Sequence, residues 1–188
     1  DIKIVIEYGM LSEDKFFEKA DKFALYPTTE NEFFTFEELK EAIKDNQTDK
    51  DDKLVVLYAS NKDEQHSYIQ AAKDKGYKVL MLDSPIVSHL LQKLETSHEN
   101  ISFVRVDSDH VDNLIKTDDE KISKLSDEEK EQLKGDFEKV IPAEKYTIQM
   151  EAMDSTAAPL IITQPEFMRR MKEMQQTGGG GMFGMGNM

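Results

Sequence analysis

The sequence predicts an α/β protein built in three successive parts: a helical segment, a small three-layer α/β/α subdomain with a short parallel sheet, and a partial α+β C-terminal domain. Three observations carry this prediction. Helical spacing of apolar residues dominates positions 1–52, and short apolar runs alternate with helix-like segments over 53–117. An acidic stretch then opens a different pattern over 118–188.

The first part is predicted to be mainly helical. Its opening isoleucines fit either the alternation of a strand or one face of a helix, and local pattern leaves residues 2–6 ambiguous. From Ser12, a candidate N-cap, apolar residues recur at helical spacing to about Leu25. Thr35 and Glu38 then form a capping box, which predicts the start of another short helix.

The second part has the rhythm of alternating strands and helices. Strands are expected at residues 54–58, 79–82 and 101–106. Helix-like segments separate them, from Asn61 to Lys75 and again after a cap at Ser84. Strands joined through helices pair in parallel by right-handed crossovers and are buried on both faces. We therefore expect a three-stranded parallel sheet covered by helices.

The third part begins with a charged linker and ends in glycine. Ser126 to Glu129 forms a second capping box, which predicts an exposed acidic helix. Alternating apolar residues predict a strand over Tyr146–Met150, with Pro159–Ile162 as its partner. A helix is expected over Phe167–Gln175, and the glycine run from Gly178 predicts a disordered Gly/Met tail.

Composition argues against several classes of function. There are 38 Asp+Glu against 24 Lys+Arg, and the formal net charge of -14 opposes nucleic-acid binding, which depends on Lys and Arg. Cys is absent, which removes disulfides, thiol nucleophiles and thiolate metal sites. No apolar run approaches the roughly 18 residues of a membrane span. We expect a soluble, cytoplasmic protein that binds neither nucleic acid nor membranes.

Aspartates after the predicted strands are the pattern that most resembles a catalytic site. Asp83, Asp107 and Asp109 stand at the edge where open α/β sheets place ligands, so they could bind magnesium in a small phosphotransfer enzyme. That chemistry also needs a glutamate after the first strand, where Ala59 and Ser60 stand, and no glycine-rich phosphate loop occurs. We favour the alternative that these side chains cap helices. No catalytic residue and no metal site is then expected.

The predicted C-terminal helix is the best candidate for a binding surface. One arc of it carries four apolar side chains: Phe167, Met168, Met171 and Met174. Methionines at this spacing more often fill a core. Little apolar sequence follows to cover this face, however, and adaptable methionine surfaces suit the recognition of varied partners. The pattern leaves a core face and a binding face open.

Six segments spread along nearly the whole chain match one known family. They are residues 8–16, 35–38, 44–50, 54–59, 103–108 and 162–171. Together they are far more specific than any single motif, and by them the chain resembles the HtpG family of bacterial heat-shock protein 90 chaperones. The glycine-rich end with its methionines is similar to the Bacteroidetes-like branch of that family.

The resemblance implies a fragment of a dimeric, ATP-driven chaperone. Residues 1–52 would be the helical end of the large middle subdomain, 53–117 the small α/β middle subdomain, and 118–188 the acidic linker helix and the N-terminal part of the C-terminal domain. It also implies helix at the ambiguous opening. ATP and magnesium would bind the parent chaperone before Asp1, and Arg105, Arg169 and Arg170 do not match its catalytic arginine. No catalysis or cofactor is therefore expected of this fragment.

The resemblance also implies partners. Unfolded or partly folded client proteins would contact positions around Met168 and Met171. The rest of the chaperone chain, a second parent copy and the seventy-kilodalton heat-shock chaperone are further expected partners. The fragment itself is expected to be monomeric, since the net charge of -14 opposes self-association.

Overall fold

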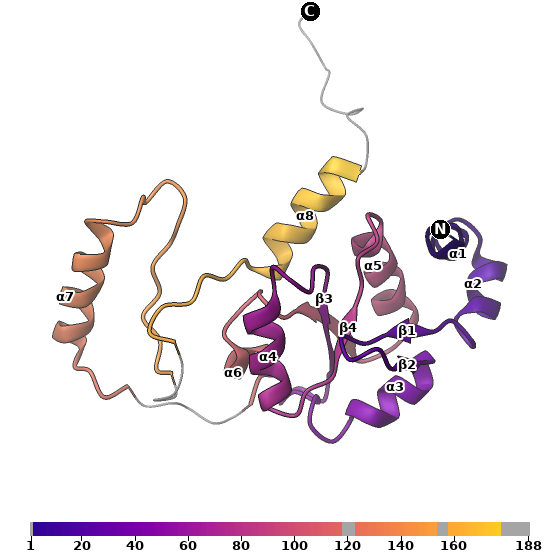
Figure 1. The fold of residues 1–188 in the computed structure, drawn as a ribbon, viewed down its shortest axis with the longest axis horizontal. Helices are drawn as coiled ribbons and strands as arrows, with labels where there is room; N and C mark the ends of the chain where they lie inside the picture. Colours follow the sequence, from indigo (N-terminus) through magenta and orange to yellow (C-terminus); the bar gives the residue numbers. More distant parts are fainter. Residues whose placement is uncertain (1, 118–122, 154–157, 178–188) are drawn as a thin grey trace, which may run out of the picture. The chain divides into compact units, whose positions relative to one another are not determined.

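The computed structural model describes residues 2–117, 123–153 and 158–177, which form two compact units (Figure 1). The first unit comprises Asp1–Thr117 together with Ile162–Met188, and the second comprises Asp118–Ile161. The domain boundaries after residues 52 and 117 stay a prediction. The Gly/Met tail expected from Gly178 lies outside the described residues.

Three parallel strands form the centre of the first unit. They are β3 (Leu54–Ala59), β4 (Val79–Met81) and β5 (Ile101–Arg105), in the order β4-β3-β5. Val56 pairs with Phe103, and Tyr58 lies between Leu80 and Arg105. The crossovers run through α4 (His66–Asp74) and α5 (Val87–Ser97), as parallel strands require. The predicted α/β fold with a short parallel sheet is confirmed.

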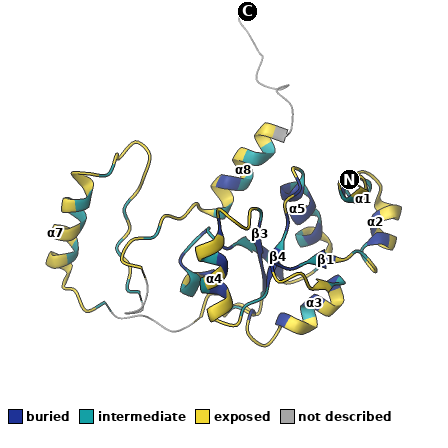
Figure 2. Cartoon of the chain, viewed as in Figure 1, coloured by how far each residue is buried: buried dark blue, intermediate teal, exposed yellow. Residues whose placement is uncertain are grey.

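The side chains of β3 alternate between two apolar cores, one on each face of the sheet. Val56 and Tyr58 join one core with residues of α5, whereas Leu57 joins the other with Ile69 of α4 and Leu114 of α6 (Val111–Leu114). Along its length β3 is almost entirely buried (Figure 2). The sheet is therefore the middle layer of a three-layer arrangement, because helices cover both of its faces.

Three helices and a small hairpin precede the sheet and pack on the α5 side. They are α1 (Ile2–Ser12), α2 (Asp14–Ala20), α3 (Phe36–Ile43) and the antiparallel pair β1 (Tyr26–Pro27) and β2 (Phe33–Phe34). The ambiguous opening is helix. The capping box of α3 is confirmed: the Thr35 hydroxyl accepts from the Glu38 N–H, and the Glu38 carboxylate accepts from the Thr35 N–H at 2.8 Å. The hairpin was not predicted.

The single helix expected from Ser12 to Leu25 is wrong. Ser12 is the last residue of α1, and its hydroxyl donates to the Tyr8 carbonyl at 2.8 Å instead of capping a following helix. The next helix, α2, begins at Asp14 and ends at Ala20. The error arises because a serine can bond back to a carbonyl four residues earlier as readily as it caps.

The helices that flank β4 also start later than predicted. The Gln65 side-chain carbonyl accepts from the backbone N–H groups of Ser60 and Asn61 at 2.8 and 2.9 Å, and this turn delays α4 to His66. The Ser84 hydroxyl accepts from the Ile86 N–H at 3.3 Å, so it closes a turn before α5 and does not cap it. Side-chain-to-backbone bonds of this kind compete with the first helical turn.

The C-terminal helix α8 (Glu166–Thr177) belongs to the first unit and lies beside α5 (Figure 1). It confirms the helix predicted over residues 167–175. The chain before it runs along the sheet's carboxyl edge: the Tyr68 hydroxyl donates to the Ile162 carbonyl, and the Gln164 N–H donates to the Asp107 carbonyl at 3.0 Å. These bonds tie α8 to the α/β part.

The second unit contains one helix among its described residues, α7 (Asp127–Glu138). Its predicted capping box is confirmed, with the Ser126 N–H donating to the Glu129 carboxylate at 2.8 Å. The strands predicted over Tyr146–Met150 and Pro159–Ile162 are wrong, since both segments lack regular structure. A lone pair of strands is marginal in water, and the second segment ends in the bond from Tyr68 to Ile162 instead.

Candidate functional site

The helix α8 turns its apolar side chains outward and one arginine inward. The exposed fractions of Phe167, Met168 and Met171 are 74%, 61% and 44%, and Met174 is half-buried. Arg169 is only 3% exposed. A helix on the surface of a globular protein normally shows the reverse orientation. We call Phe167, Met168 and Met171 the apolar edge; it lies on the surface and not in the core.

Glu166 is the centre of the charged contacts beneath α8. Its Oε1 atom accepts hydrogen bonds from the Tyr58 hydroxyl at 2.8 Å, from the Arg170 Nε at 2.6 Å, and from Arg169. Its Oε2 atom accepts from the backbone N–H of Arg105 at 3.0 Å. One carboxylate of α8 thus meets β3, β5 and its own helix.

Arg170 extends these contacts to α5. Its guanidinium donates to both oxygens of Glu95, at 2.7 and 3.1 Å, and to the Phe103 carbonyl at 2.7 Å. Glu95 in turn accepts from the Phe103 N–H at 2.7 Å. Paired arginine–carboxylate bonds of this kind fix direction as well as distance. Arg170 therefore binds the end of α5 and strand β5 together.

Arg169 and Glu173 complete the cluster on the other side. Arg169 lies over the Tyr58 ring, 5.6 Å from its centroid, and also donates to the Tyr58 hydroxyl. Its Nη1 lies 2.7 Å from Glu173, whose other oxygen accepts from the Ser88 hydroxyl of α5. We call the eight participants the polar cluster: Tyr58, Ser88, Glu95, Arg105, Glu166, Arg169, Arg170 and Glu173.

Members of the polar cluster shift each other's pKa values. Burial raises the pKa of the Tyr58 hydroxyl, and the charge of Glu166 raises it further. Burial alone would lower the pKa of Arg170, but Glu95 and Glu166 raise it above its ordinary value. Burial would raise the pKa of Glu173, yet hydrogen bonds from Ser88 and Arg169 lower it overall. Both arginines and Glu173 are therefore charged at neutral pH, and Tyr58 is a neutral donor.

The aspartates of the alternative enzyme hypothesis do not share a site. Asp83 pairs with Lys3 at 2.5 Å, and Asp107 accepts two bonds from Arg105 at 2.6 and 2.9 Å. Asp83 follows β4 and Asp107 follows β5, on opposite sides of β3, so about two strand spacings of roughly 4.8 Å separate them. Asp109 accepts from the backbone N–H of the next residue. Nothing in this arrangement favours phosphotransfer.

The favoured capping role of these aspartates is wrong as well. The N-cap of α5 is Ile86, which makes no side-chain cap bond. The N-cap of α6 is His110, whose ring nitrogen accepts from the Asp112 N–H. Asp107 instead forms an ion pair with Arg105, and Asp83 forms one with Lys3. Sequence spacing does not reveal the second pair, because Lys3 lies 80 positions away from Asp83.

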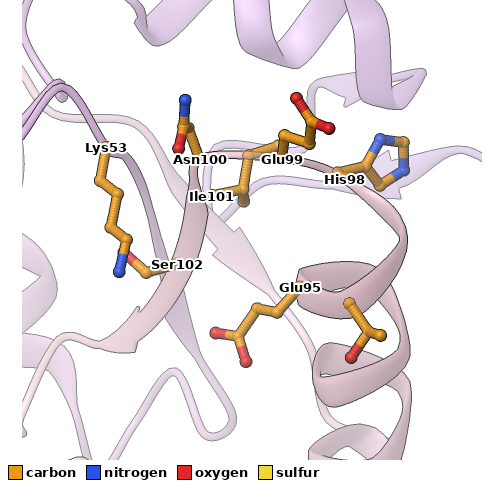
Figure 3. A pocket seen from close by; sticks show the side chains of 8 residues that line it. Lys53, Glu95, His98, Glu99, Asn100, Ile101 and Ser102 are labelled. Atoms are coloured by element: carbon orange, nitrogen blue, oxygen red, sulfur yellow. The ribbon is translucent and has the colours of Figure 1, made fainter.

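A shallow recess lies where α5 ends and β5 begins. Its lining consists of Lys53, Glu95, Thr96, His98, Glu99, Asn100, Ile101 and Ser102. In Figure 3 the Glu95 and Glu99 carboxylates point in different directions, and Lys53 lies apart from His98. Within the described ranges no group of three His, Asp or Glu residues could hold a metal ion, and no helix is long and apolar enough to cross a membrane. The recess therefore carries no recognisable chemistry.

The sequence pattern placed the apolar side chains of α8 on one arc but left a core face and a binding face open, and it missed the polar cluster. Glu166, Arg169, Arg170 and Glu173 have the three- and four-residue spacing of ion pairs within a helix. That signal predicts a solvated face. Their burial depends on Tyr58, Glu95 and Arg105, which lie 61 to 108 positions away in the sequence.

Curated relatives identify the family. The HtpG chaperones of Bacteroides thetaiotaomicron and Bacteroides fragilis are each 48% identical to this chain over 177 residues, which cover 93% of the chain and 26% of the relative. The HtpG chaperone of Porphyromonas gingivalis is 40% identical over 178 residues. The chain spans only about a quarter of the length of these relatives, at 26%. No protein-family model matches it.

Among solved structures, the middle domain of a Plasmodium falciparum heat shock protein is similar, with a TM-score of 0.41 and 15% sequence identity. The likeness covers 54% of this chain and 43% of that one. The assignment of the family rests on the sequence relatives, whose similarity extends over nearly the whole chain. By that similarity the chain belongs to the HtpG family of heat-shock protein 90 chaperones, as a fragment of the family's much longer proteins.

Proposed function

We propose that this chain supplies a scaffold and a client-contact surface to an ATP-driven chaperone, and that it performs no catalysis itself. The observation that carries the proposal is the apolar edge, where Phe167, Met168 and Met171 are 74%, 61% and 44% exposed on one helix. Contiguous exposed apolar side chains mark sites of protein interaction. Methionine adapts its shape to different partners, which suits a surface that binds many unfolded chains.

We propose that ATP binding and dimerisation belong to the remainder of the parent chaperone. The chain covers 26% of its curated relatives, which leaves ample sequence for an ATP-binding domain and for dimer helices. We propose ATP with magnesium as the cofactors of that parent, a homodimer as its assembly and the cytoplasm as its location. The seventy-kilodalton heat-shock chaperone is proposed as a partner of the parent.

Client affinity of the fragment should be weak. Fully burying one Met side chain is worth about 1.5 to 3 kcal/mol, so two supply roughly 3 to 6 kcal/mol before ordering costs. Micromolar binding needs about 8 kcal/mol. A dimeric parent would present two such edges at high effective concentration. Strong protection of clients is therefore expected of the parent chaperone and not of this chain.

The proposal is tested by binding to a permanently unfolded protein. Fluorescently labelled, reduced and carboxymethylated ribonuclease is titrated with the chain, and its anisotropy is followed to high micromolar concentration. The variant is Met168→Ser with Met171→Ser. We expect this double variant to weaken binding about tenfold, since burying each methionine side chain contributes at most a few kcal/mol before ordering costs, and both methionines belong to the apolar edge.

The matched control is Phe23→Ser, since Phe23 is an apolar side chain of the same unit that is 67% exposed and lies outside α8. Binding by the control should stay within about threefold of the unmodified chain. Equal weakening by both variants would show that any exposed apolar side chain suffices. Unchanged binding by the methionine variant would remove the apolar edge from the client surface.

Calorimetry with ATP and magnesium tests the absence of catalysis. We expect no saturable heat from this chain. A saturable heat that disappears in Asp83→Asn with Asp107→Asn would favour the enzyme hypothesis over the chaperone scaffold.

A further inference from the structure

Charged side chains of α8, namely Glu166, Arg169, Arg170 and Glu173, form hydrogen bonds and ion pairs with the rest of the first unit. Arg169 of α8 is buried, at 3% exposure, whereas the apolar edge points outward. Charged side chains are almost never fully buried unless they are paired. Most surface helices bury apolar side chains such as leucine. On its buried side α8 instead places charged side chains that are paired with one another.

These pairs come from all three neighbouring elements. Tyr58 of β3 and Glu95 of α5 meet Glu166 and Arg170 at 2.8 and 2.7 Å. The backbone of β5 contributes as well, with the Phe103 carbonyl 2.7 Å from Arg170 and the Arg105 N–H 3.0 Å from Glu166. Three directions of attachment leave a rigid helix little freedom to slide or to roll.

Buried ion pairs contribute little net stability, because removing two charges from water costs about as much as their attraction returns. They do specify geometry, since a bond length and a bond direction must both be met. An apolar contact has no such direction. A helix with an apolar edge can roll and bury that edge against a neighbour, unless another contact fixes its rotation.

We propose that Arg169 and Arg170 are positioning residues: the polar cluster, and not apolar packing, sets how α8 sits on the α/β part, and it thereby keeps the apolar edge exposed. The pairing of Arg170 with Glu95 fixes the helix along its axis. The stacking of Arg169 on the Tyr58 ring fixes its rotation. The apolar edge is then the face that remains. Its value for client contact rests on the proposed function, whereas the positioning does not.

The chain contains no Cys, so a single introduced cysteine reports on one place. Met168→Cys places a reporter on the apolar edge, and Ser88→Cys places one under Glu173, where Ser88 is 3% exposed. We call them the edge reporter and the buried reporter. Each is combined with Arg169→Met and Arg170→Met, which remove the charges but keep long unbranched side chains. The rate of maleimide modification under native conditions is divided by the rate in denaturant.

The matched control carries Lys172→Met, which likewise replaces a positively charged side chain of α8 by methionine but at an exposed position outside the polar cluster. With both arginines present, the edge reporter should react quickly and the buried reporter slowly. In the double methionine variant the relative rate at one of the two should change by about tenfold or more. A slower edge reporter means that α8 has rolled, and a faster buried reporter means that it has detached. The control should change neither rate by more than about threefold.

Rates at both reporters within about threefold of those with the arginines present would overturn the proposal, because α8 would then sit in place without its arginines. Melting temperature is recorded in parallel. A purely stabilising role would lower it and leave the relative rates unchanged, and this outcome also contradicts positioning. The anisotropy titration with unfolded ribonuclease is independent of the labelling, so client binding and positioning can fail separately.

Discussion

The helices α5 and α8 lie side by side and are amphipathic in opposite senses. α5 buries Val87, Leu90, Leu91 and Leu94 in the core that it shares with β3. α8 buries Arg169 and leaves Phe167 and Met168 at 74% and 61% exposure. The first helix is held by the hydrophobic effect, which tolerates small changes of orientation. The second is held by directed charges, and Tyr58 is the side chain that belongs both to the core and to the polar cluster.

This difference assigns the two helices separate tasks. Loss of α5 packing should unfold the whole unit, because its side chains reach Phe36 of α3 and Val56 of β3 through one continuous core. Loss of α8 packing should be local. Segments that open locally at low cost are the ones available for binding partners.

Leu91→Ala should produce the largest loss of stability. Leu91 is fully buried at 0% exposure, and removing a buried leucine side chain typically costs about 2 to 5 kcal/mol. Urea unfolding followed by circular dichroism should show the midpoint of the whole first unit shifted down. A midpoint that does not move would mean that α5 is not an integral part of the core.

Glu166→Gln should sharpen the contrast, since it leaves two arginines without their shared carboxylate. Breaking a partly buried pair is expected to cost about 2 kcal/mol, and that cost should fall on α8 alone. Hydrogen exchange of the α8 amides should then accelerate roughly 30-fold, while exchange in β3 stays unchanged. Glu37→Gln serves as the control, because Glu37 forms only an exposed pair with Lys40. Equal acceleration in β3 would contradict local attachment.

The two helices differ in how well the sequence predicts their contacts, because some contacts follow from local spacing and others join residues far apart in the chain. The α5 core was predictable because Leu90, Leu91 and Leu94 lie at helical spacing and the strands around them are apolar. For α8, the spacing of Met168 and Met171 predicted an apolar face, but it left open whether that face is buried in a core or exposed for binding. The polar cluster could not be predicted, because it joins Arg170 to Glu95 across 75 positions.

Other failures of prediction have local causes. Ser12 and Ser84 were both predicted as helix caps. The Ser12 hydroxyl instead donates to the Tyr8 carbonyl, and the Ser84 hydroxyl closes a turn before α5. The strand expected over Tyr146–Met150 failed for a different reason. Its alternating pattern is real, but within the described residues of its unit no neighbouring strand accepts its backbone groups.

Acid should loosen α8 before it affects the core. The pKa of Glu173 is lower in the folded chain than its ordinary value, because Ser88 and Arg169 stabilise the carboxylate against the effect of burial. A group with a depressed folded pKa contributes stability above its unfolded pKa, which is about 4.3 for Glu, and loses that stability as pH falls through the folded pKa. The hydrogen-exchange rate of the α8 amides, corrected for intrinsic rates, should therefore rise as pH falls below about 4.3. Glu173→Gln should abolish this rise, and a rise that persists in the variant would assign it to another carboxyl.

The smallest expected effect gives the most direct test of the central claim, that α8 presents its apolar edge to solvent. Met168→Glu with Met171→Glu is compared with the unmodified chain by urea unfolding. Substitutions at exposed positions usually change the free energy of unfolding by no more than about 0.5 kcal/mol, and we predict a change of that size. A loss of several kcal/mol would contradict the account, because it would mean that two carboxylates had been forced into a buried apolar contact.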